Sequence, residues 1–82
     1  MTKEKIWTVP LHRAVAFFRE QEDVTEERSN VFLFRSCRIV LTEVKAAGMG
    51  MWATKRIKVT MEGEDADVES MYHRFFVRFL SM

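Results

Sequence analysis

The sequence predicts a small α+β domain, a two-layer sandwich in which an antiparallel sheet carries its helices on one face. Residues 37–44 and 51–61 both alternate between apolar and polar side chains, which is the period of a half-buried strand. The glycine-bearing segment 45–50 between them indicates a hairpin. Residues 65–82 repeat at helical spacing, and such a helix is needed to cover the apolar face of the hairpin.

Length and composition predict one domain, residues 1–82, with one modest core. The 82 residues are 48% hydrophobic, which is too apolar for a disordered chain. Lys and Arg number 13 against 12 Asp and Glu, so the net charge is +1. A domain that works mainly by holding phosphate backbones is usually more basic than this.

The N-terminal part predicts a strand followed by a helix. Residues 3–9 alternate loosely, and Pro10 suits the first turn of a helix. An apolar stripe at helical spacing follows: Leu11, Ala14, Val15 and Phe18. The alternative is a strand through residues 14–18.

The middle of the chain predicts a connector and then a long β-like run. Residues 23–30 are polar and charged without periodicity, and the spacing of Asp23 and Glu26 fits a capping box, so a short helical turn is expected there. Residues 31–44 predict one long strand with a bulge near Ser36, because residues 35–36 offer no Gly, Asn or Pro for a tight turn. Two strands joined at that point are the alternative.

The alternation also assigns faces to the hairpin strands, and hence a core. Cys37, Ile39 and Leu41 share one face, and so do Ile57, Val59 and Met61. The full predicted core is Leu11, Val15, Phe18, Leu33, Ile39, Leu41, Ile57, Val59, Val68, Met71, Tyr72, Phe75 and Phe79.

The polar face of the hairpin gives the alternative functional hypothesis. Arg38, Arg56 and Lys58 are predicted to lie there with Trp52, and Trp7 is a further candidate for the same surface. Cations beside aromatic planes are typical of sheets that bind nucleic acids, because the cations neutralise phosphates and the rings stack on bases. The competing interpretation is an ordinary solvated sheet face, which the near-neutral charge favours.

The C-terminal helix gives the leading hypothesis. Its start carries Asp65 and Asp67, where carboxylates favour a helix N-terminus. Its apolar surface is wider than a single sheet contact requires, and the extra width comes from Phe76, Val77 and Leu80. We expect these three residues to bind a protein partner, and a second copy of the chain is the favoured partner. An unpaired strand edge is the second expected route.

Catalytic and cofactor chemistry has little support in the sequence. Cys37 is expected in the core, and His12 and His73 are not tied to it by any motif. We therefore expect no cofactor and no metal, and an enzyme is the less favoured class. The absence of an apolar run of about 20 residues argues against a membrane span. The single cysteine and the mixed N-terminal residues predict a cytoplasmic protein.

Overall fold

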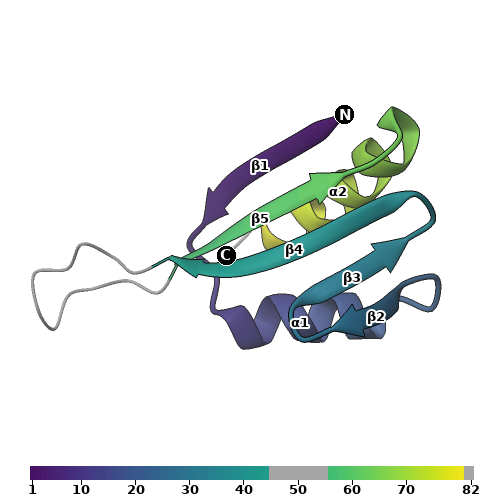
Figure 1. Ribbon diagram of the computed structural model, residues 1–82. Helices are drawn as coiled ribbons and strands as arrows, with labels where there is room; N and C mark the ends of the chain where they lie inside the picture. Colours follow the sequence, from purple (N-terminus) through teal and green to yellow (C-terminus); the bar gives the residue numbers. More distant parts are fainter. Residues whose placement is uncertain (45–55, 81–82) are drawn as a thin grey trace, which may run out of the picture.

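The computed structural model describes residues 1–44 and 56–80 and contains a five-stranded antiparallel sheet with two helices (Figure 1). In chain order the elements are β1 (Thr2–Trp7), α1 (Leu11–Glu20), β2 (Thr25–Arg28), β3 (Val31–Phe34), β4 (Cys37–Val44), β5 (Arg56–Glu62) and α2 (Asp65–Phe79). The strand order is β1-β5-β4-β3-β2, so β1 and β2 form the two edges. The predicted α+β class is confirmed. The predicted turn at 45–50 and strand residues 51–55 lie outside the described residues.

Both helices cover the same face of the sheet (Figure 1), and one cluster of buried side chains joins the two layers. The strands contribute Phe32, Phe34, Cys37, Ile39, Leu41, Ile57, Val59 and Met61, and the helices contribute Ala14, Phe17, Phe18, Val68, Met71, Phe75 and Phe79. At the centre, the Phe18 ring stacks on the rings of Phe32 and Phe75, with centroids 5.3 and 5.6 Å apart. The face predicted for the alternation in β4 and β5 is confirmed.

Helix α1 confirms the helical prediction over the alternative strand at residues 14–18, but its inner side differs from the predicted stripe. Phe17 and Phe18 are both buried, and the Phe17 ring packs 5.7 Å from that of Phe79. Turning both rings inward moves Leu11 and Val15 onto the flank, where they are only partly buried. Their assignment to the core was therefore wrong.

Strand β2 lies where the sequence predicted a connector with a helical turn, so that prediction was wrong. All four residues of Thr25–Arg28 are exposed, and the strand pairs with β3 through a register shift between Glu26 and Arg28. An edge strand without a buried residue has no apolar alternation to reveal it. A contact with α1 stabilises this pairing, because the Arg19 guanidinium of the helix donates two hydrogen bonds to the Glu26 carboxylate of β2.

Residues 31–44 form two strands rather than one bulged strand. The turn between them consists of Arg35 and Ser36, and Arg35 adopts the left-handed conformation with φ of 54°. Tertiary contacts compensate for the unfavourable turn residues. The Ser36 backbone N–H and hydroxyl donate to the Asp67 carboxylate of α2, at 3.2 and 2.8 Å. The Ser36 hydroxyl also accepts a hydrogen bond from the Glu64 backbone N–H.

The tight turn also decides which residues of β3 face the core. It places Phe34 opposite Cys37 and Phe32 opposite Ile39, and directly opposite residues in an antiparallel pair share a face. Leu33 therefore points away from the helices and is only partly buried, which corrects its predicted core position. Tyr72 of α2 is likewise partly buried, at the margin of the core rather than inside it.

Gly63 allows the β3–β4 turn to approach the start of α2. Its φ is 156°, and a Cβ built there would lie 2.5 Å from the Ser36 carbonyl oxygen. The helix then begins at Asp65 without a side-chain cap of its own at Glu64. Because Asp67 is held by Ser36, this junction fixes the position of α2 against the sheet.

Candidate functional site

The sheet face that points away from the helices, called the open face below, contains the cations of the alternative hypothesis. Arg38 lies opposite Glu62, and its guanidinium is 3.3 Å from the Glu27 carboxylate. Lys58 lies between Thr42 of β4 and Ile6 of β1. The neighbours of these two cations are therefore carboxylates or uncharged residues. The open face is a surface of mixed charge rather than a basic stripe.

Among the described residues, no tryptophan lies beside the cations of the open face. Trp7 lies opposite Ile57, which places it on the helix face. Its ring packs edge-on against Phe75 and Phe76 of α2, with centroids 5.1 and 6.1 Å apart. The prediction that Trp7 could join the basic surface was therefore wrong. Trp52 lies outside the described residues.

The end of α2 presents the three residues of the leading hypothesis, here called the α2 flank: Phe76, Val77 and Leu80. Val77 is 56% exposed and Leu80 is 62% exposed, whereas Phe76 is partly buried. The other side of the same helix is fully occupied by the core. Since Phe76 also contacts Trp7, the flank is continuous with the aromatic margin under β1.

The margin between β1 and α2 also holds two lysines that the sequence did not single out. The Lys3 ammonium lies 4.5 Å from the centre of the Tyr72 ring, and that of Lys5 lies 5.0 Å from the Trp7 ring. An ammonium over an aromatic face is attracted by the ring quadrupole. Alternation along residues 3–9 places Lys5 and Trp7 on one side of the strand, but only the pairing of β1 with β5 shows that this side faces α2.

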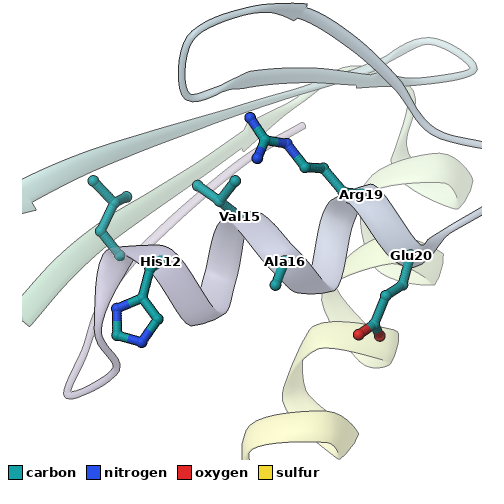
Figure 2. A pocket seen from close by; sticks show the side chains of 6 residues that line it. His12, Val15, Ala16, Arg19 and Glu20 are labelled. Atoms are coloured by element: carbon teal, nitrogen blue, oxygen red, sulfur yellow. The ribbon is translucent and has the colours of Figure 1, made fainter.

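A shallow groove of about 550 Å³ runs along one side of α1 (Figure 2). It is lined by Leu11, His12, Val15, Ala16, Arg19 and Glu20, all from this one helix. Figure 2 shows the Arg19 side chain directed toward the strands, where it binds Glu26, while Glu20 extends from the opposite side of the helix. Glu20 is 3.6 Å from Arg78 of α2. The charged groups of the groove are thus already engaged within the fold.

Reactive groups are scattered in the part of the chain that the structure describes. Cys37 is fully buried, and burial, with a smaller effect of the Asp67 carboxylate, raises the pKa of its thiol to about 11. A thiol of this kind is a poor nucleophile at neutral pH. His12 and His73 are exposed on different helices. Among residues 1–44 and 56–80, no three His, Cys, Asp or Glu side chains gather as metal ligands would.

Neither described helix has the length and apolar character needed to cross a membrane. The chain was compared with protein-family models, with curated proteins and with solved structures, and none of these matched it. The α2 flank and the open face are the two candidate binding surfaces of the described residues.

Proposed function

We propose that this protein is a small interaction module that associates with itself and acts through surface complementarity rather than through chemistry. The observation that carries the proposal is the α2 flank, where Val77 and Leu80 are both more than half exposed beside partly buried Phe76. A single exposed apolar residue is ordinary, but neighbouring ones on a helix end indicate a surface that a partner covers.

A second copy is the favoured partner because a two-fold interface brings the same patch from each chain together. A cluster of only three residues then doubles in area, and apolar burial contributes about 25 cal/mol per Å². The neighbouring Trp7 and Tyr72 rings extend the patch under β1, where Trp7 is 6.3 Å from Tyr72. Aromatic residues are enriched at the centres of protein interfaces.

We also propose a cytoplasmic location. The support is the single cysteine of the chain, since one thiol provides no internal disulfide of the kind that stabilises small secreted domains. Cys37 is buried in the core as a free thiol. A fluorescent fusion followed by cell fractionation checks this, and recovery in a membrane or extracellular fraction would contradict it.

Size-exclusion chromatography with light scattering tests self-association. The wild-type protein is expected to have the mass of a dimer or larger assembly at micromolar concentration, and Leu80→Asp is expected to reduce it to a monomer. Because Leu80 is 62% exposed, this change should leave folding nearly unaffected. A matched control is Ala66→Asp, which adds the same charge at an exposed position near the other end of α2. A wild-type monomer at high concentration contradicts the proposal.

A further inference from the structure

The backbone of β1 has free hydrogen-bonding groups at every second residue. Met1 and Gly63 exchange two backbone hydrogen bonds: the nitrogen of each donates to the carbonyl oxygen of the other, at 2.8 and 3.1 Å. Such pairs alternate along an antiparallel ladder, so Lys3, Lys5 and Trp7 bond to β5. The backbone N–H and C=O groups of the residues between them point away from the sheet: Thr2, Glu4 and Ile6.

The two edges of the sheet differ in their capacity to accept another strand. Strand β1 pairs with β5 over six residues without a register shift. Strand β2 has four residues, all exposed, and its pairing with β3 is irregular at Glu26 and Arg28. Short length and irregular pairing are common protections of an edge against strand addition, and β2 has both. The regular β1 edge therefore is the better place for a second chain to extend the sheet.

We propose that a second copy of the chain pairs with β1, antiparallel and with the two-fold axis at Ile6, so that two sheets join into one. This inference rests on the proposed self-association and specifies its geometry. A two-fold axis perpendicular to the sheet keeps the helices of both copies on the same side. Residues directly opposite each other must share a face, and the axis must therefore pass through a residue rather than between two residues.

Charge selects the register. With the axis at Glu4, the two Glu4 residues lie directly opposite each other, and Lys3 lies opposite Lys5 of the second copy. With the axis at Lys3 or at Lys5, the lysine at the axis lies directly opposite the same lysine of the second copy. Like charges directly opposite each other destabilise a sheet. With the axis at Ile6, apolar side chains meet on the open face, and Lys5 lies opposite Trp7 of the second copy.

Two further registers are excluded by the ends of the strand. An axis at Thr2 sets Lys3 against the N-terminal ammonium of the second copy, which already lies 3.4 Å from Asp65. An axis at Trp7 leaves Trp7 as the one β1 residue that lies opposite a β1 residue of the second copy, whereas the axis at Ile6 sets residues 5–7 of the two copies opposite each other. The Ile6 register thus remains as the one compatible with the charges and with the fold.

The side chains at this axis fit the contacts that it creates. Ile6 is 51% exposed on the open face, and its own copy would cover it. On the helix face, Lys5 already sits 5.0 Å from the Trp7 ring within one chain. In the Ile6 register, Lys5 also lies directly opposite Trp7 of the second copy, on the same face of the joined sheet. Trp7 in turn contacts Phe76, so the joined edge continues into the α2 flank.

Disulfide trapping tests the register. Directly opposite residues in a hydrogen-bonded antiparallel pair have Cα atoms about 5.5 Å apart, which suits a disulfide. Ile6→Cys should therefore form a covalent dimer on mild oxidation. Glu4→Cys is the matched control, because in this register the two Glu4 positions are about 14 Å apart along the strands. The native Cys37 thiol is buried and should stay unreacted in both variants.

The expected result on a non-reducing gel is a majority of dimer for Ile6→Cys and monomer for Glu4→Cys. Efficient trapping of Glu4→Cys alone, or trapping only when the two variants are mixed, would overturn the Ile6 register. If light scattering shows a dimer but neither variant is trapped, the edge pairing is wrong and self-association stands. If the wild type is a monomer, both proposals are wrong.

Discussion

Replacing Gly63 by Ala perturbs the junction that positions α2, and its effect can be estimated from the structure. The new Cβ would lie 2.5 Å from the Ser36 carbonyl oxygen, 2.8 Å from the Ser36 carbonyl carbon and 2.9 Å from the Cys37 Cα. All three atoms belong to the backbone, so no side-chain rotation relieves the overlap. The β3–β4 turn must move away from the start of α2.

That movement has two energetic consequences. Overpacking of this kind costs about 1–3 kcal/mol. Separation of the turn from the helix also weakens the hydrogen bonds of the Ser36 hydroxyl, which donates to Asp67 and accepts from the Glu64 N–H, each worth about 1 kcal/mol. We expect Gly63→Ala to lower the free energy of unfolding by about 2–4 kcal/mol, which corresponds to a melting temperature lower by roughly 10–25 °C in a domain of this size.

Urea denaturation followed by circular dichroism measures this change. Ser36→Ala is the matched control, because it removes the same hydroxyl without adding an atom near the turn. Its expected cost is about 1–2 kcal/mol, smaller than that of Gly63→Ala. If Gly63→Ala unfolds within about 0.5 kcal/mol of the wild type, the close approach of Ser36 to Gly63 does not govern the position of α2, and the reasoning is refuted.

The remaining predictions concern acid stability and nucleic acids. Hydrogen bonds from Ser36, with a smaller contribution from Arg35, hold the pKa of Asp67 below its ordinary value. Its stabilising effect is therefore present above the unfolded pKa of about 3.9 and is lost as pH falls through the lower folded pKa. Asp67→Asn should be less stable than the wild type at neutral pH, with a difference that shrinks on acidification, and a constant difference across a pH series of urea titrations would contradict this. For labelled oligonucleotides we expect no salt-sensitive binding at moderate protein concentration. Binding that is abolished by combining Arg56→Ala with Lys58→Ala would instead favour the nucleic-acid hypothesis.

The elements with a buried side could be predicted from the sequence because burial imposes a period on them. The faces of β4 and β5 and the helical pattern of α2 follow from alternation and from 3.6-residue spacing. Strand β2 could not be predicted, since no residue of Thr25–Arg28 is buried. Its position depends on hydrogen bonding to β3, and this tertiary contact leaves no periodic pattern in the sequence.

Two errors in assigning faces have the same origin. In Val31–Phe34 every residue is apolar, so alternation gives no face, and Leu33 was placed in the core instead of Phe32 and Phe34. The two-residue turn decides which residues of β3 face the core, because it places Phe34 opposite Cys37. For β1 the period was visible, but the side on which Trp7 lies is set by its pairing with Ile57.

The candidate site was predictable to the same extent. The excess apolar width of the last helix pointed to Phe76, Val77 and Leu80, and the structure places Val77 and Leu80 at the surface. The outward backbone groups of β1, on which the proposed pairing at Ile6 rests, depend on the strand order. No local sequence signal contains that order, because β1 pairs with the strand farthest from it in the chain.

The mass of the wild-type protein in solution, measured by light scattering across a range of concentrations, tests the central claim most directly. Self-association through a two-fold surface predicts a dimer whose fraction rises with concentration and falls on Leu80→Asp, while Ala66→Asp behaves as the wild type. A mass that stays at the 9.7 kDa of one chain over the whole range would contradict the claim.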